Sequence, residues 1–189
     1  MSRRAPRILF VCTGNLCRSP FAELLLRREL AEAVVASAGT HAAVGQPMDP
    51  DTAEPARGAG LDPSAHRARQ LAVADIEGAD LVLGLAREHR AAVVSLLPRA
   101  HRYAFTLLEF TRLADDLRRS GSEEAPQTVP DFVTAVGARR GMSPPPLVPE
   151  DDDIADPAGL GRAAHLAATE EIAAAVDLLA GALRTVVPA

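Results

Sequence analysis

The sequence predicts an α/β domain in which helices cover both faces of a parallel β-sheet. Short apolar runs of strand length alternate with stretches of helical periodicity, an order that is typical of parallel sheets. The first run, residues 8–11, contains no polar side chain, as expected for a strand that is buried on both faces. The chain of 189 residues has the length of one domain and no internal repeat, so we assign residues 1–189 to a single domain.

The elements are expected in a regular order. After the strand at 8–11, Ser19-Pro20 predicts the start of a helix, with Ser19 as the N-cap and Pro20 as the first helical residue. Further strands are predicted at 34–37, 80–83 and 102–105. Helices are predicted between them, at 51–60 and 87–97. Near the carboxyl end, helical periodicity predicts a long helix with one core-facing stripe, formed by Ile172, Val176, Leu179, Leu183 and Val186.

The segment at about 120–153 differs from the rest of the chain because it combines prolines with acidic residues. We expect it to be the longest weakly structured part of the domain, with one short helix near 131–140. The three consecutive aspartates at 151–153 are interpreted as a solvated run. The paired arginines are interpreted as solvated helix faces, at 27–28, 118–119 and 139–140.

The composition excludes several functions. All 20 basic residues are arginine, which excludes a Walker-type phosphate loop and a Schiff-base enzyme because both require lysine. The net charge is −5 and there is no basic run, so no nucleic-acid partner is expected. No stretch approaches the ~18 apolar residues of a membrane span or the apolar core of a signal peptide. We therefore expect no membrane partner and a cytoplasmic location.

The cysteines also restrict the chemistry. Cys12 and Cys17 are too few for the disulfide scaffold of a small secreted domain. A zinc site with four Cys or His ligands is not predicted, because there is no second cysteine pair and the five histidines are scattered. We expect reduced thiols, and we predict neither a metal nor a cofactor.

The loop between the first strand and the first helix is the predicted site of chemistry. Cys12 is followed after five residues by Arg18 and Ser19. The backbone N–H groups of a tight loop before a helix N-terminus form an anion-binding cradle, and Arg18 can bind two phosphate oxygens with its planar fork. The helix dipole and the arginine favour a thiolate at Cys12, which is then placed to attack phosphorus. Ser19 is expected to donate a hydrogen bond to that sulfur, and Gly14 to let the backbone approach the ligand. The predicted phosphate-binding residues are Thr13, Gly14, Asn15, Leu16, Cys17 and Ser19.

Attack on a phosphate ester also requires an acid that protonates the leaving oxygen. The candidates are Asp131, the run at 151–153, and Asp156. Asp156 differs from the others because Pro157 biases its backbone to an extended conformation. It also lies between the proline-rich segment and the last helix, from where it can reach over the cradle. Spacing alone leaves the choice among these carboxylates open.

Residues 10–20, Phe-Val-Cys-Thr-Gly-Asn-Leu-Cys-Arg-Ser-Pro, resemble the signature of the low-molecular-weight protein-tyrosine phosphatase family. Weaker resemblances follow at 37–40 (Ser-Ala-Gly-Thr), at 66–71 (His-Arg-Ala-Arg-Gln-Leu) and at Asp156-Pro157 ahead of the last helix. The resemblance runs in order over roughly residues 7–187 and therefore concerns the whole domain.

This resemblance implies a four-stranded parallel sheet of flavodoxin-like type and hydrolysis through a phosphocysteine intermediate. It implies that Cys12 is the nucleophile, Arg18 the phosphate clamp, and Asp156 the acid and then the base for water. It also implies a protective disulfide between Cys12 and Cys17 under oxidation. The implied substrate is a phosphotyrosine protein or a small phosphate monoester, with inorganic phosphate as the product. The residues implied to hold the loop and tune the thiolate are Asn15 and Ser19.

The sequence departs from the family pattern at positions that bear on the substrate. Members that act on phosphotyrosine usually have an aromatic residue just after the Asp-Pro pair, whereas this chain has Ala158 and Gly159. Ala68 stands where the family often has serine. These differences put the identity of the substrate in question but leave the dephosphorylation chemistry unaffected.

Three alternatives remain. Arsenate reduction on the same fold would need an external thiol, because no cysteine follows Cys17 to relay a disulfide. Phosphoarginine hydrolysis belongs to a branch that has threonine where this chain has Leu16. A non-catalytic phosphate-binding interaction module is disfavoured, because such a module has no chemical reason to keep Cys12, Arg18 and Asp156 together.

Overall fold

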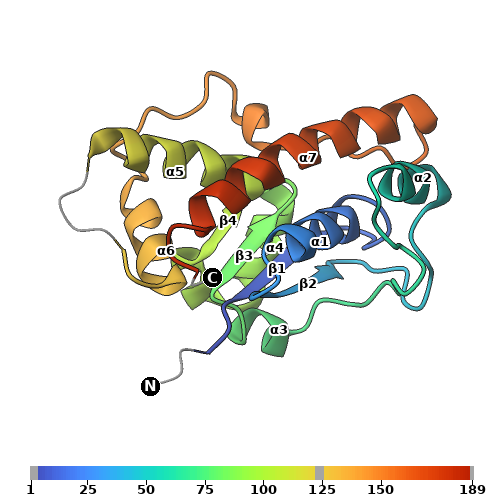
Figure 1. The fold of residues 1–189 in the computed structure, drawn as a ribbon, viewed down its shortest axis with the longest axis horizontal. Coiled ribbons are helices and arrows are strands. Elements are labelled where there is room, and N and C mark those ends of the chain that lie inside the picture. Colours follow the sequence, from blue (N-terminus) through green and yellow to red (C-terminus); the bar gives the residue numbers. More distant parts are fainter. Residues whose placement is uncertain (1–3, 122–125, 188–189) are drawn as a thin grey trace.

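The protein folds around a four-stranded sheet whose strands are all parallel, in the order β2-β1-β3-β4 (Figure 1). The structure is a computed structural model that describes residues 4–121 and 126–187, so residues 122–125 of the proline-rich segment lie outside it. The predicted fold class is confirmed. The strands are β1 (Arg7–Cys12), β2 (Val34–Gly39), β3 (Leu81–Gly84) and β4 (Ala104–Thr106).

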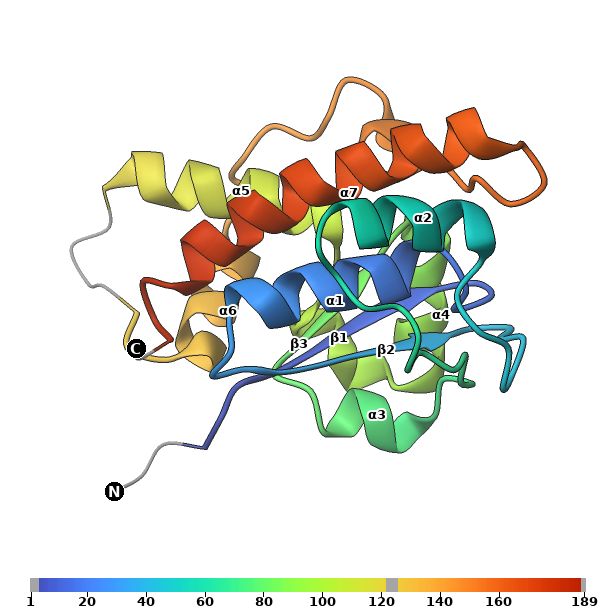
Figure 2. The ribbon, with the colours of Figure 1, turned by 45° about the vertical axis from the view of Figure 1, so that its right-hand side comes forward.

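Helices cover both faces of this sheet (Figures 1 and 2). On one face lie α1 (Arg18–Glu29), α5 (Leu107–Ser120), α6 (Val129–Ala138) and α7 (Arg162–Leu183), with α2 (Pro50–Gly58) packed against α1 and α7. On the other face lie α3 (Val73–Glu77), α4 (Arg87–Leu96) and the 3₁₀ helix η1 (Pro98–Arg102). A second 3₁₀ helix, η2 (Pro149–Asp152), lies in the long segment before α7.

The central strand β1 has a core on each side because successive side chains of a strand point to opposite faces. Ile8 and Phe10 belong to the larger core beneath α1, α5 and α7. Leu9 and Val11 belong to the smaller core beneath α3 and α4. All four side chains are buried, which confirms the prediction of a strand covered on both faces.

Among the described residues are two α-helices that were not predicted from the sequence, α3 and α5. A capping box begins α5, in which the Thr106 hydroxyl accepts a hydrogen bond from the Glu109 N–H (3.0 Å) and the Glu109 carboxylate accepts one from the Thr106 N–H (3.2 Å). The spacing from Thr106 to Glu109 ahead of an apolar helix face was a readable signal for this helix. The short helix expected near 131–140 is present as α6, and the long last helix is present as α7. Val186, the last residue of the predicted apolar stripe, is buried as well, but it lies after the end of α7 at Leu183.

The strand order creates a switch point at the carboxyl edge of the sheet, between β1 and β3. The chain passes from β1 outward to β2 and then returns past β1 to β3, so the loops after β1 and β3 diverge at this edge. Open α/β sheets bind ligands where the connections diverge in this way. The predicted phosphate loop, residues 13–17, lies at this position.

The described residues include no helix that is long and apolar enough to cross a membrane.

Candidate active site

The predicted loop joins the last residue of β1 to the first residue of α1. Cys12 ends β1 and Arg18 begins α1, and both side chains are buried. The prediction that Ser19 is the N-cap is wrong, because the helix starts two residues earlier, at Arg18, and Cys17 is the N-cap. Ser19 instead lies in the first turn, where its Oγ is 2.9 Å from the Sγ of Cys12. The hydroxyl that we expected to cap the helix therefore contacts the predicted nucleophile.

Asn15 organises the interior of the loop. Its backbone is left-handed, with φ 55°, a conformation that asparagine tolerates better than most residues. Its buried amide donates hydrogen bonds to the hydroxyls of Ser19 and Ser37, each at 2.9 Å. Because Ser19 accepts this bond, its own hydrogen is free to point at the sulfur of Cys12.

The carbonyl groups of the loop are turned outward. Those of Cys12, Thr13 and Gly14 accept hydrogen bonds from the N–H groups of residues 40, 41 and 43, at 2.9, 3.0 and 3.1 Å. The carbonyl of Leu16 accepts one from the Asp49 N–H at 3.0 Å. Within the described part of the chain, the N–H groups of residues 13–17 donate to no backbone carbonyl. The loop therefore has the donors of an anion cradle available.

Residues after β2 support the loop from outside. His66 contacts the Asn15 carbonyl through Nε2 (2.7 Å), and the Arg69 N–H donates to the Asn15 side chain (2.9 Å). Gly39 ends β2, and a Cβ there would lie 2.4 Å from the Thr13 carbonyl oxygen. The two weaker motifs at 37–40 and 66–71 therefore hold the loop in shape.

The other loop residues are placed as follows. A Cβ on Gly14 would make only an ordinary contact with Leu16, at 3.7 Å, so protein packing does not require glycine there. Both cysteines are free thiols. Burial raises the pKa of Cys17 to about 12, so this group is a neutral thiol at physiological pH.

Asp156 reaches the loop through Arg18. The Arg18 guanidinium forms an ion pair with the Asp156 carboxylate (2.7 Å) and donates to the Ile154 carbonyl (3.0 Å). The Ile154 N–H donates in turn to the carbonyl of Leu85, just after β3 (2.8 Å). The Arg18 side chain is 4% exposed and that of Asp156 is 47% exposed, so the aspartate lies at the mouth of the site. Asp131, a rival candidate for the acid, is instead engaged with Thr128 at the start of α6.

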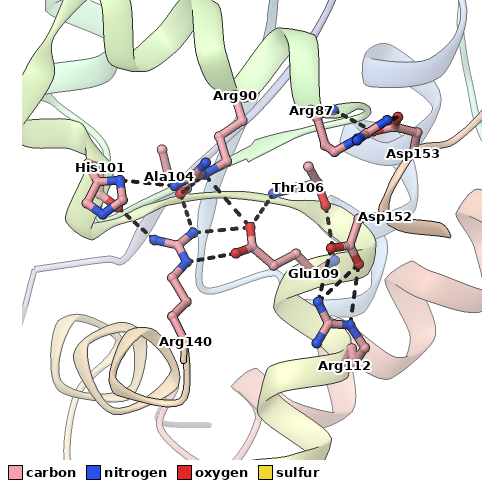
Figure 3. A network of polar contacts seen from close by, with 10 residues as sticks. All are labelled: Arg87, Arg90, His101, Ala104, Thr106, Glu109, Arg112, Arg140, Asp152 and Asp153. Atoms are coloured by element: carbon pink, nitrogen blue, oxygen red, sulfur yellow. Dashed lines mark hydrogen bonds and ion pairs between the residues drawn. The ribbon is translucent and has the colours of Figure 1, made fainter. Parts of the chain in front are cut away.

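The acidic run before Asp156 is anchored, as Figure 3 shows. Asp153 accepts hydrogen bonds from the N–H (2.6 Å) and the Nε (2.9 Å) of Arg87, at the start of α4. Asp152 pairs with Arg112 of α5 at 3.0 Å. The interpretation of the whole run as solvated is therefore wrong for these two aspartates. Arginines on distant helices reach them, and spacing along the chain cannot reveal such partners.

The arginine pair at 139–140 also differs from its prediction as a solvated helix face. Arg140 pairs with Glu109 at 2.7 Å (Figure 3). Its guanidinium also lies 3.8 Å from the centre of the Phe105 ring. Its neighbour Arg139 pairs with Asp116. The pair at 139–140 is thus not a solvated helix face; it fastens the end of α6 to β4 and α5.

His89 is a site residue that was not among those predicted from the sequence. It lies in the first turn of α4, is buried, and contacts the Thr13 hydroxyl through Nε2 at 2.9 Å. Its Nδ1 is buried without a hydrogen-bond partner among the described residues. Burial, aided by the positive charge of Arg18, lowers the pKa of His89 to about 4. The ring is therefore neutral at physiological pH. No local sequence signal identifies this contact.

This shifted pKa predicts a pH-dependent stability. The His89 pKa falls from 6.5 in the unfolded chain to about 4 in the folded protein, so only the unfolded state takes up this proton as the pH drops through that window. Stability therefore falls with pH, by about 2 kcal/mol between pH 7 and pH 5. We expect His89→Gln to lose this component, so that urea unfolding shows a shallower pH dependence than in the wild type. Parallel curves for the two proteins would contradict the assignment.

The fold and the site together define an α/β protein in which a cysteine and an arginine flank a tight loop at the carboxyl edge of the sheet. Comparisons with known proteins agree with this class. Residues 7–119 match the family described as low molecular weight phosphotyrosine protein phosphatase. The low molecular weight protein-tyrosine-phosphatase Etp of Escherichia coli K12 is 37% identical over 116 residues, which are 60% of this chain and 78% of that protein.

Two further relatives match over nearly the whole chain. A protein-arginine-phosphatase of Geobacillus stearothermophilus is 33% identical over 180 residues, which are 95% of this chain and 97% of that protein. The crystal structure of the tyrosine phosphatase amsI of Erwinia amylovora superposes with a TM-score of 0.71 at 25% identity, covering 95% of this chain and 93% of that one. The chain belongs to the low molecular weight phosphotyrosine protein phosphatase family and is a hydrolase of that class.

Proposed function

We propose that the protein hydrolyses phosphate monoesters on proteins, with Cys12 as the nucleophile, Arg18 as the phosphate clamp and Asp156 as the acid and base. The observation that carries this proposal is the 2.7 Å contact between Arg18 and Asp156. It brings a carboxylate from the far end of the chain to the loop that begins at Cys12. Nucleophile, clamp and acid are thus grouped at one edge of the sheet.

In the first step, the Cys12 thiolate attacks phosphorus, the S–P bond forms, and the bond to the leaving oxygen breaks. The loop N–H groups and Arg18 stabilise the charge on the equatorial oxygens. A phosphate dianion in the cradle competes with Asp156 for Arg18, which frees the carboxyl group to face the leaving oxygen. Asp156 then gives a proton to the leaving oxygen.

In the second step, the Asp156 carboxylate removes a proton from water, which attacks phosphorus as the S–P bond breaks. The products are inorganic phosphate and the Cys12 thiolate. The Ser19 hydroxyl, 2.9 Å from the sulfur, stabilises the departing thiolate. Our prediction that the reaction needs no metal rests on this supply of donors and positive charge by the protein.

The role of Asp156 is tested by changing the leaving group. Asp156→Asn keeps the shape of the side chain but cannot give a proton. We expect turnover of phenyl phosphate to fall on the order of 10²-fold or more, and turnover of p-nitrophenyl phosphate to fall less than about tenfold, because nitrophenolate leaves without protonation. Steady-state rates on the two esters measure the difference. Equal losses would show that Asp156 does not act as the acid.

We propose phosphotyrosine proteins as the substrate class. Leu16 supports this choice, because its apolar side chain lies in the loop and suits an aromatic ester better than a charged guanidinium. Phosphoarginine is the second candidate, and it is favoured by the full-length match to a protein-arginine-phosphatase. Arsenate reduction and a non-catalytic role have no such support in the comparisons.

A direct competition separates the two substrates. Peptides of one sequence, carrying either phosphotyrosine or phosphoarginine, are supplied to the wild type and to Leu16→Thr. We expect the wild type to prefer phosphotyrosine and the variant to shift its preference toward phosphoarginine. Release of inorganic phosphate measures both activities. A wild-type preference for phosphoarginine would reverse the assignment while leaving the phosphatase chemistry intact.

A further inference from the structure

A group of metal-ligating side chains lies beside the phosphate loop. The Sγ of Cys17, a carboxylate oxygen of Asp49 and a ring nitrogen of His165 all lie within 4.8 Å of one another. Among the residues that the structure describes, no other set of three or more Cys, His, Asp or Glu residues is grouped in this way. The three come from separate elements, namely the end of the loop, the residue before α2, and the first turns of α7.

The surroundings hold these side chains in place. The Nδ1 of His165 is 2.8 Å from the Thr52 hydroxyl and 3.7 Å from the Asp49 carboxylate, and the ring is 3% exposed. The Asp49 N–H donates to the Leu16 carbonyl at 3.0 Å, and the Asp49 carboxylate accepts a hydrogen bond from the Asp51 N–H at 2.9 Å. The carboxylate is thus oriented by its role at the start of α2. Cys17 and Asp49 are both partly exposed, which leaves a route to solvent.

We propose that Cys17, Asp49 and His165 bind one Zn²⁺ ion. A thiolate, an imidazole and a carboxylate are all zinc ligands, and three protein ligands with water in the fourth position form an open tetrahedral site. The sulfur and nitrogen donors disfavour Mg²⁺ and Ca²⁺, which prefer oxygen ligands. On binding, the Cys17 S–H bond breaks, its proton passes to solvent, and an S–Zn bond forms. The Thr52 hydroxyl turns away from Nδ1, which donates its lone pair to the metal. No group is oxidised or reduced.

The three side chains of this site take no part in the proposed phosphoryl transfer, which uses the side chains of Cys12, Arg18 and Asp156. Cys17 belongs to the phosphate loop through its backbone N–H alone. The zinc site differs from the site with four Cys or His ligands, which the sequence does not predict. Only two of its ligands are Cys or His, and a carboxylate and a water molecule take the other two positions. A zinc ion here would link the loop to α2 and α7. Removal of metal by a chelator is not expected to lower turnover, since none of the reaction steps uses it.

The test measures binding directly, on the full chain without substrate. Co²⁺ serves as a spectroscopic substitute for zinc, and Zn²⁺ affinity is measured by competition with a chromophoric chelator. We expect one metal ion per chain and a near-ultraviolet absorption band from the Cys17 thiolate bound to Co²⁺. Asp49→Asn keeps the start of α2, and His165→Asn keeps a partner for Thr52. Each is expected to weaken Zn²⁺ binding by about tenfold or more.

Two matched variants locate the metal. His101→Asn removes an exposed histidine elsewhere, and Cys12→Ser removes the other thiol of the loop; both are expected to bind Zn²⁺ as tightly as the wild type. Loss of binding in Cys12→Ser, with full binding in His165→Asn, would place the metal on the nucleophile and overturn the proposal. Absence of one-to-one binding in the wild type would also overturn it. Neither result bears on phosphatase activity, because no turnover is measured.

Discussion

Replacement of Cys12 by serine is expected to reduce phosphatase turnover to background. The serine hydroxyl is not ionised near neutral pH and cannot replace the thiolate, so no covalent phosphoenzyme forms. The loss should be on the order of 10⁴- to 10⁶-fold in kcat, as is typical when a nucleophile is removed. Release of p-nitrophenol from p-nitrophenyl phosphate measures it, under reducing conditions that keep both thiols free.

Binding separates loss of chemistry from loss of structure in this variant. Cys12 is buried at the end of β1, and serine differs from it by one atom, so the cradle should persist. Calorimetry is expected to show that Cys12→Ser still binds inorganic phosphate, and its thermal unfolding should remain cooperative. A variant that turns over at the wild-type rate would exclude Cys12 as the nucleophile and with it the phosphocysteine mechanism.

Replacement of Arg18 by lysine is the second large effect that we expect. Lysine keeps the charge but loses the planar fork, which contacts both Asp156 and the Ile154 carbonyl and is proposed to bind two phosphate oxygens. We expect kcat/KM to fall on the order of 10²- to 10³-fold, through a lower kcat and a higher KM. The inhibition constant of vanadate should rise in parallel, because vanadate occupies the same cradle.

Arg27→Lys is the matched control, since Arg27 lies on the same helix and forms an exposed ion pair with Glu23. Exposed pairs of this kind contribute little to stability, so this variant should match the wild type in rate and in unfolding. If Arg18→Lys also matches the wild type, the charge alone accounts for the role of Arg18 and the fork-like clamp is wrong.

Much of the fold could be read from the sequence because it follows from local patterns. An unbroken apolar run at 8–11 can only be buried on both faces, and the alternation of strands and helices then predicts a parallel sheet. The ends of the helices were predicted less accurately than their existence. The first helix begins at Arg18 rather than after Ser19, because Ser19 turns its hydroxyl to the Cys12 sulfur and leaves the cap to another residue.

Parts of the site could not be predicted because their contacts join residues that are distant along the chain. Nothing near His89 in the sequence indicates that its ring meets Thr13. In the same way, the sequence indicates that the aspartates before Asp156 are solvated, whereas in the structure two of them pair with Arg87 and Arg112. These partners come from α4 and α5, and α5 itself was missed.

By itself, the sequence determined the fold class and the position of the loop between Cys12 and Arg18. Strand burial and the alternation of strands with helices depend on residues that are close together in the chain. The tertiary structure alone decided which carboxylate meets Arg18, which groups hold the loop, and which side chains gather around Cys17. Those outcomes depend on how the sheet brings the start, middle and end of the chain to one edge, and sequence spacing carries no information on such distances.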